Sequence, residues 1–323
     1  MNRLTFETIV QDYIQEKKAI GNKFTKAEQT LKRVVALQNE IDKNKPILSK
    51  ALFTRWAEKT SWEKPINQST RLSVLRGLSK YMIRHNYQAV FIPVRYVPYK
   101  EYEYLPYIFS DEELGRILKA VDNWVFECDS LHARMEFPLV IRLLIGSGLR
   151  ISETLSIEKD HLDLKTNTLF LNKTKNQSER IIPIADSLGE KLASYREKTS
   201  FIPAFSSSRW LFPNPEGGPY YSGTFYQFFR KMLWKVDIPH RGKGKGPRLH
   251  DLRHTYAVRV ITNWVRNGYD VTTSLPYLAI YMGHSGIKAS QHYLRLTKDM
   301  YPDLLGMVGN CYSWIIPEVV CEE

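Results

Sequence analysis

The segment PRLHDLRHTY, residues 247–256, holds two histidines, two arginines and an aspartate within ten residues. If a helix begins near Leu249, His250 and Arg253 lie three residues apart and share one helix face. Such a face could bind a metal, bind a phosphate, or simply be solvated. His250 and His254 have a metal-ligand spacing, but no HExxH motif or cysteine pair accompanies them, and the arginine between them opposes a cation. We therefore expect no metal here.

Two other segments carry residue types that suit phosphate chemistry. GSGLRIS places Arg150 just after a glycine turn, at an expected helix N-terminus, where backbone N–H groups and the helix dipole favour an anion. Glu153, three residues on, can pair with Arg150 and fix the orientation of its guanidinium. In YMGHSGIKASQHYLRL, Tyr293 follows His284 by nine residues. Taken alone, each segment is weak evidence, because an arginine in such a turn can be an ordinary salt-bridged residue and a tyrosine on a basic helix is usually just packed or exposed.

The elements that would position these residues begin with a helical region. Residues 1–93 show helical hydrophobic spacing in four stretches, FETIVQDYIQEKK, AEQTLKRVVALQNEI, SKALFTRWAEK and STRLSVLRGLSKYMIRHN. We expect Trp56 and Tyr81 to pack in the core of these helices rather than to stack on bases. The proline-containing stretch at residues 91–110 shows no periodicity and predicts an extended linker.

A second domain is expected after this linker. Ser110 and Glu113 form a capping-box signature, and the apolar helix MEFPLVIRLLIGS ends near Gly148. The runs NTLFLN and ERIIPI predict a β-hairpin with a lysine-rich tip. The helical pattern returns from Ser222, interrupted by the basic glycine loop RGKGKGP at residues 241–247. The predicted fold is mostly α, with a small β-sheet or hairpin in the second domain.

Composition narrows the class of protein. The 323-residue chain is 43% hydrophobic and carries a net charge of +12, with a pI near 9.4. Residues 1–100 hold 19 Lys and Arg against 8 Asp and Glu, which indicates a basic module that binds nucleic acid or another polyanion. No apolar run is long enough to span a membrane and the N-terminus lacks a signal-peptide pattern, so we expect a cytoplasmic protein. Cys128, Cys311 and Cys321 are too scattered for a disulfide framework or a zinc site.

The motifs GLRISE, HDLRHTYA and MGHS, followed by a tyrosine nine residues after the last histidine, resemble in this order the tyrosine recombinase (phage integrase) family. The resemblance covers residues 107–300. It implies a helical core-binding domain over residues 1–95, a linker over residues 96–106, and a catalytic domain with a C-terminal tail over residues 107–323. Together these would form a two-domain clamp around DNA.

The resemblance also implies a catalytic set, and one position stays open. Lys175 lies eight residues before Pro183, the spacing typical of the family, and is preferred over Lys173 as the general acid. His250 would hydrogen-bond a phosphate oxygen or accept the tyrosine proton. The implied catalytic residues are Arg150, Lys175, His250, Arg253, His284 and the nucleophile Tyr293, with Glu153 supporting Arg150.

The family's reaction implies the partners. These are double-stranded DNA recombination sites, a homo-tetramer assembled on DNA, a Holliday junction intermediate and accessory recombination proteins, with no metal, ATP or other cofactor and no membrane. The outcome would be integration, excision or transposition of a mobile element. The expected phosphate contacts are Lys17, Lys18, Lys23, Lys26, Arg71, Arg76 and Lys80 in the basic module, and Arg241, Lys243 and Lys245 in the glycine loop.

Two features leave alternatives. The sequence after Tyr293 lacks the family's frequent TH pattern and loosely resembles the tail of some transposon-borne recombinases, while the apolar residues 312–320 would pack on a neighbouring subunit or on their own domain. Two other functions fit the same fold: a type IB topoisomerase, which uses similar chemistry as a monomer, and a non-catalytic DNA-binding regulator. A regulator would not need all six catalytic residues.

Overall fold

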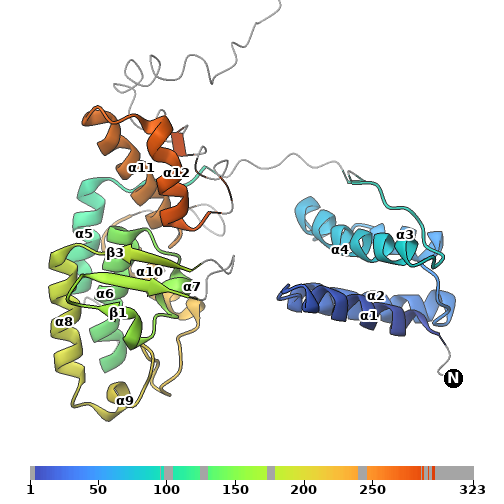
Figure 1. Ribbon diagram of the computed structural model, residues 1–323, viewed down its shortest axis with the longest axis horizontal. Coiled ribbons are helices and arrows are strands. Elements are labelled where there is room, and N and C mark those ends of the chain that lie inside the picture. The colour runs from blue at the N-terminus through green and yellow to red at the C-terminus, as the bar shows by residue number, and fades with distance from the viewer. Residues whose placement is uncertain are drawn as a thin grey trace, which may run out of the picture. The chain divides into compact units, whose positions relative to one another are not determined.

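The computed structural model confirms a mostly helical chain with one small sheet (Figure 1). It divides into two compact units, Met1–Tyr104 and Leu105–Glu323, which are treated separately below. The structure describes residues 4–94, 96–97, 105–123, 130–172, 179–238, 246–284, 286, 290 and 293–294.

The described residues of the first unit form four helices, one for each amphipathic stretch that the sequence predicted. They are α1 (Phe6–Ala19), α2 (Thr25–Asp42), α3 (Lys50–Ala57) and α4 (Pro65–Arg84). Side-chain caps start two of them, because the Thr5 hydroxyl accepts from the Thr8 amide and the Ser49 hydroxyl accepts from the Leu52 amide. The apolar faces of all four helices meet in one core.

Aromatic side chains hold the centre of this first core. The Tyr13 ring lies 5.6 Å from that of Phe24 and 5.2 Å from that of Tyr81. Trp56 and Tyr81 are both buried, so the prediction that they serve packing rather than base stacking is confirmed.

The second unit is built around the apolar helix α6. This helix packs against α5, α7, α8 and α11, and α5 begins with the capping box that the sequence predicted at Ser110 and Glu113. The elements are α5 (Asp111–Asp122), α6 (Leu131–Ser147), α7 (Ile151–Thr154), the 3-10 helix η1 (Lys159–His161), β1 (Leu162–Asp163), β2 (Thr168–Leu171), β3 (Arg180–Pro183), α8 (Asp186–Thr199), α9 (Pro203–Ser206), α10 (Ser222–Lys235), α11 (Asp251–Arg266) and α12 (Val271–Met282).

The three strands form an antiparallel sheet in the order β1-β2-β3. The predicted hairpin is confirmed as β2 and β3, while the two-residue strand β1 is an addition too short to show a period in the sequence. Leu169 of β2 faces Ile182 of β3, and both are fully buried. Because side chains alternate along a strand, Arg180 lies on the same buried face as Ile182.

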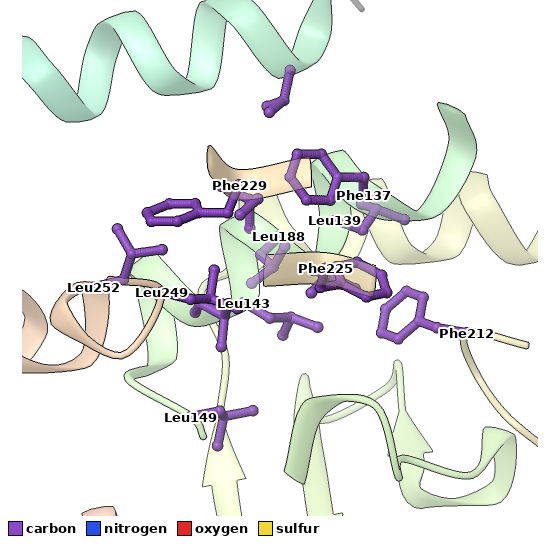
Figure 2. Close-up of a cluster of buried hydrophobic side chains, with 14 of the residues drawn as sticks. Phe137, Leu139, Leu143, Leu149, Leu188, Phe212, Phe225, Phe229, Leu249 and Leu252 are labelled. Carbon is purple, nitrogen blue, oxygen red and sulfur yellow. The ribbon is translucent and has the colours of Figure 1, made fainter. Parts of the chain in front are cut away.

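The main core of this unit anchors the segments that carry the predicted catalytic residues. Figure 2 shows Leu149, Leu249 and Leu252 in one cluster with the aromatic rings of α6 and α10. Each of these leucines directly precedes a predicted site residue: Leu149 precedes Arg150, Leu249 precedes His250, and Leu252 precedes Arg253. Packing of the leucine therefore fixes the backbone from which the polar side chain extends.

A further cluster joins α11 to α12, which lie side by side at one end of the unit (Figure 1). It contains Ala257, Val258 and Ile261 of α11, and Leu278 and Met282 of α12. Tyr293 belongs to the same cluster. The tyrosine is thus held against the two helices whose ends carry the predicted histidines.

Candidate active site

Arg150 lies in the sharp turn between α6 and α7. The turn is possible because Gly148 adopts a left-handed conformation with φ of +58°, and a Cβ at this position would lie 2.4 Å from the Tyr256 ring. Arg150 then occupies the N-cap of α7. Its Nη1 donates to Glu153 Oε1 at 2.7 Å, and its backbone amide donates to Glu153 Oε2 at 3.0 Å. The predicted pair of Arg150 and Glu153 is present.

Arg253 projects from the first turn of α11 and is only 2% exposed. Its Nη1 donates to the Gly148 carbonyl at 2.7 Å, and its Nη2 donates to the Met282 carbonyl. The helix begins at Asp251, two residues later than predicted, so His250 occupies the N-cap. The His250 ring lies 4.9 Å from that of His254, edge to face.

The C-terminal end of α12 brings the remaining elements together. Gly283 ends the helix with φ of +62°, and Arg150 Nη2 donates to its carbonyl at 2.9 Å. Arg180 Nε donates to the Tyr281 carbonyl at 2.8 Å. Since Arg253 donates to the Met282 carbonyl, three guanidinium groups donate to three successive carbonyls at this helix end.

Tyr293 lies between the two histidine-bearing segments and is only 3% exposed. Its ring is stacked with that of His284 at 5.9 Å and tilted against that of His254 at 5.5 Å. His284 Nδ1 is 2.8 Å from the Ser290 hydroxyl. Burial raises the pKa of Tyr293, and the charges of Arg253 and Arg150 and a hydrogen bond from Arg253 oppose this shift.

Glu153 is the carboxylate at the centre of the site. Burial would raise its pKa, but hydrogen bonds from Arg180 and Arg150 outweigh that effect, so its pKa lies below the usual value. Arg180 Nη2 donates to Glu153 Oε2 at 2.8 Å. The pKa of Arg253 is lowered to about 10, mainly by burial and to a smaller extent by the neighbouring charge of Arg150. Arg253 is therefore still protonated at neutral pH.

Both histidines of the predicted set are neutral at pH 7. Removal from water and the charges of Arg253 and Arg150 lower the pKa of His284 to about 4. His250 keeps an exposed edge, yet the protein around its ring and the same two arginines lower its pKa to about 4. Neutral imidazoles can accept a proton or donate one N–H, whereas further cations would repel the arginines.

The structure brings most of the predicted set into one place. Arg150, Glu153, His250, Arg253, His284 and Tyr293 are linked by the contacts above, although they come from four separate segments. Lys175, its alternative Lys173, and the glycine-loop residues Arg241, Lys243 and Lys245 lie outside the described residues. The three cysteines do as well.

The predicted DNA contacts of the first unit fall into two groups. Lys23, Lys26 and Lys80 are exposed and form no ion pair among the described residues. The others are engaged: Arg71 binds the Glu63 carboxylate through Nε and Nη2 and donates to the Trp56 and Glu58 carbonyls. The remaining engaged side chains are Lys17 and Lys18, which pair with Glu16 and Glu28, and Arg76, which donates to the Pro93 and Val94 carbonyls.

Two residues at the site were missed from the sequence. Arg180 is 8% exposed and contacts both Glu153 and α12. The alternation of ERIIPI carried the signal, because Arg180 shares its parity with Ile182 and Ile184 and so had to point inward. His254 was considered only as a metal ligand, and its ring instead lies between those of His250 and Tyr293.

Within the described residues, no group of three or more His, Cys, Asp or Glu side chains could hold a metal ion. No helix in the same part of the chain is long and apolar enough to cross a membrane.

This chain is similar to the proteins of one known family and to several individual recombinases. The sequence model of the phage integrase family matches residues 108–300. A Sinorhizobium fredii protein named as an integrase/recombinase, y4rB, is 26% identical over 294 residues, covering 90% of this chain and 92% of that protein. The tyrosine recombinase XerC of Staphylococcus carnosus is 26% identical over 235 residues, covering 71% of this chain and 70% of its own length.

Solved structures share the fold at lower identity. The XerH recombinase, in a post-cleavage complex with its palindromic difH substrate, gives a TM-score of 0.63 at 17% identity and covers 95% of this chain and 85% of that one. The Tn1549 transposon integrase bound to transposon right-end DNA gives 0.60 at 14%, with coverages of 90% and 94%. A lambda integrase tetramer on a Holliday junction gives 0.56 at 16%, with coverages of 90% and 78%. The chain belongs to the phage integrase family and is a tyrosine-type site-specific recombinase.

Proposed function

We propose that this recombinase cuts and rejoins DNA through a covalent 3′-phosphotyrosine on Tyr293. The observation that carries the proposal is the grouping of a buried tyrosine with two arginines and two neutral histidines around one carboxylate. Such a set supplies a nucleophile, positive charge for a phosphorane and groups that move protons. A DNA-binding regulator would need the charge alone.

Arg150 and Arg253 would bind the scissile phosphate. A guanidinium carries five N–H groups, and Arg150 directs two of them to Glu153 and the Gly283 carbonyl among the described residues. Its other N–H groups remain for phosphate oxygens, which a planar fork binds bidentately. Arg253 also approaches the Tyr293 hydroxyl, so one arginine would contact both the nucleophile and its target.

The proton movements follow from the pKa shifts. Tyr293 must lose its proton as its oxygen bonds to phosphorus, and burial makes this loss harder unless a base or a cation assists. Neutral His250 would accept that proton or hydrogen-bond a phosphate oxygen, and His284 would donate to the other oxygen. The bond to the 5′-oxygen breaks, and that oxygen would take a proton from Lys175.

The covalent link keeps the energy of the broken bond. A 5′-hydroxyl from another strand can attack it and release Tyr293, so that exchange replaces hydrolysis. Two such exchanges would pass through a Holliday junction in a homo-tetramer, as in the lambda integrase complex that shares this fold. Similarity to the Tn1549 integrase and to the integrase/recombinase y4rB supports a role in moving a mobile element.

We assign DNA binding to both units. Residues 1–95 would act as the core-binding domain, residues 96–106 as the linker, and residues 107–323 as the catalytic domain, with the two domains clamping the duplex. The exposed Lys23, Lys26 and Lys80 support this role for the first unit.

A covalent-trap assay tests the proposal. Wild-type protein and Tyr293→Phe are incubated, with EDTA present, with sheared and nicked DNA from the source genome and its mobile elements. After denaturation, the protein-linked DNA is isolated and sequenced. Tyr277→Phe, on the exposed side of α12 and 73% exposed, is the matched control.

We expect adducts with wild type and Tyr277→Phe, resistant to EDTA, and none with Tyr293→Phe although it still binds DNA. An adduct on Tyr293→Phe, or DNA binding by wild type without any adduct, contradicts the proposal. A plasmid assay then separates two enzymes with the same adduct. Exchange between two copies of the recovered site supports the recombinase, whereas relaxation of supercoils without exchange supports a type IB topoisomerase.

A further inference from the structure

Arg180, at the start of β3, is a buried arginine outside the predicted catalytic set. It points to the core side of the sheet, where an uncompensated charge would be costly. Its Nη2 meets Glu153 Oε2 at 2.8 Å and its Nε meets the Tyr281 carbonyl at 2.8 Å. One side chain therefore connects the sheet to both α7 and the end of α12.

Through Glu153, Arg180 reaches Arg150. The Glu153 carboxylate accepts from Arg180 through Oε2 and from Arg150 Nη1 through Oε1. The backbone amide of Arg150 also binds Oε2. A carboxylate held from one side by Arg180 presents a fixed oxygen to Arg150 on the other, so the direction of the Arg150 fork depends on Arg180.

Through α12, Arg180 reaches His284. Its Nε holds the carbonyl of Tyr281, three residues before His284. Its guanidinium also lies directly against Gly283, because a Cβ built there would be 2.6 Å from Nη1. Nη1 is buried and has no hydrogen-bond partner among the described residues. The turn that aims His284 therefore rests on the face of this guanidinium.

We propose that Arg180 is a positioning residue for the phosphate site, fixing Arg150 through Glu153 and His284 through the end of α12. This role rests on the proposed cleavage by Tyr293. We expect Arg180 itself to touch no DNA, because it is only 8% exposed and is enclosed by Glu153, Gly283 and the sheet. Lysine cannot replace it, since one ammonium cannot reproduce the two directions that Nε and Nη2 serve.

The test uses the duplex that the covalent trap recovers, nicked so that cleavage is irreversible. Arg180→Lys and Arg180→Met are compared with wild type for the adduct-forming rate at saturating DNA, for Kd and for Tm. The matched control is Arg142→Lys. Arg142 likewise binds a carboxylate, that of Asp122 at 2.6 Å, and a carbonyl, that of Pro138 at 3.2 Å.

We expect Arg180→Lys to slow adduct formation by about 10- to 100-fold, because small misplacements of catalytic groups cost rates of this order. Its Kd for the duplex should be unchanged. Arg142→Lys should lower Tm by a similar amount and leave the rate at the wild-type value. An Arg180→Lys rate equal to that of wild type, beside a normal wild-type adduct, overturns the positioning role alone. A wild type without a Tyr293 adduct overturns the proposed cleavage and the role that rests on it.

The pH profile provides a readout that loss of stability does not move. The charged and titratable groups around Glu153 come from three places. They are Arg150 at the start of α7, Arg180 of β3, and His250 and Arg253 at the start of α11. In Arg180→Met the strongest of the hydrogen bonds that lower the Glu153 pKa is lost, so this pKa rises. The acid limb of the cleavage rate should then move to higher pH than in wild type.

A double variant guards against misfolding of Arg180→Met. Glu153→Gln together with Arg180→Met removes one charge of each sign, which a core tolerates better than the loss of one partner. If Arg180 acts through Glu153, the two changes together slow cleavage by far less than the product of their separate effects. Fully multiplicative effects, or an acid limb that stays in place, count against the inference.

Discussion

The two units differ in how their partly or fully buried arginines are paired with carboxylates. In the first unit, Arg71 pairs with one carboxylate, that of Glu63. Its Nε, Nη1 and Nη2 all donate hydrogen bonds, to Glu63 and to two backbone carbonyls. In the second, Arg150, Arg180 and Arg253 surround the single carboxylate of Glu153. The basic unit thus has a balanced internal pair, while the nearly neutral unit contains a local surplus of positive charge.

This difference shows that the net charge of a unit does not reveal how much charge is gathered at a particular site within it. The first hundred residues hold most of the excess charge, with 19 basic and 8 acidic side chains, but much of it is exposed lysine, screened by salt. The surplus beside Glu153 is buried, where charge interacts more strongly. Neutral His250 and His284 add nothing to it. In the proposed function, the scissile phosphate would balance this surplus.

The largest difference between the two units should appear when the carboxylate of Glu153 or that of Glu63 is removed. Glu153→Gln leaves the buried Arg180 and the partly buried Arg150 without their counter-charge and should lower the free energy of unfolding by about 3 kcal/mol. It should also slow cleavage by about 100-fold, because Arg150 loses its orientation. Urea unfolding and adduct formation on the recovered duplex measure the two effects.

Glu63→Gln is the counterpart in the first unit. It should destabilise the protein while leaving the adduct-forming rate at saturating DNA unchanged, because Arg71 keeps its two carbonyl contacts. Equal losses of cleavage in the two variants would remove the distinction between a structural and a functional pair.

A pair of glycines tests the packing of the Arg180 guanidinium. Gly283 and Gly268 both have positive φ, +62° and +72°, so alanine costs about 1 kcal/mol of backbone strain at either position. At Gly268 nothing lies within 4 Å of the added Cβ, whereas at Gly283 it meets Arg180 Nη1 at 2.6 Å. Gly283→Ala should therefore lose about 1 kcal/mol more stability and about 10-fold in cleavage rate.

Thermal unfolding and the adduct assay measure both glycine variants. Gly268→Ala should cleave like wild type, which separates strain in a turn from displacement of a guanidinium. Equal thermal stability and equal cleavage rates in the two variants would mean that Arg180 can move aside without loss of stability or activity.

The sequence predicted local elements and most of the site, and the limits have physical causes. Four helical stretches, the capping box at Ser110 and the hairpin follow from periodicity and caps, which are local. The motifs named the residues that meet around Glu153. Arg180 was missed because a charged residue in a strand suggests solvent. Its parity with Ile182 indicated the buried face, but its partners Glu153 and Tyr281 are distant in the sequence and only the structure identifies them.

The histidines give the site a dependence on pH that begins at about pH 6.5, whereas the Arg71–Glu63 pair depends on pH only in the more acidic range where Glu63, whose pKa is lowered by Arg71, takes up its proton. In the unfolded chain a histidine takes up a proton below a pKa of about 6.5, whereas His284 in the fold does so only near 4. The unfolded state therefore binds more protons between these values, and stability falls as the pH drops from about 6.5 to 4. His284→Asn should reduce this fall.

Unfolding in urea at pH 7.5, 6 and 5 measures the effect of His284→Asn. The comparison is His85→Asn, at the C-terminal end of α4 in the first unit. A pH slope that His284→Asn leaves intact would show that this imidazole is not held neutral by the arginines around it.

The smallest effects concern the surface of the first unit, where the sequence ranked Arg71 and Lys26 alike as phosphate contacts. Lys26 is exposed and unpaired among the described residues, so Lys26→Ala should leave Tm unchanged and reduce the slope of log Kd against log salt concentration by about 1. Arg71→Lys should lower Tm without changing this slope, because the donors of Arg71 are already bound within the unit. If Arg71→Lys instead changes the slope, DNA must draw the guanidinium away from Glu63. The first unit would then also contain an internal pair that an incoming phosphate can break, and the contrast with Glu153 would become one of degree.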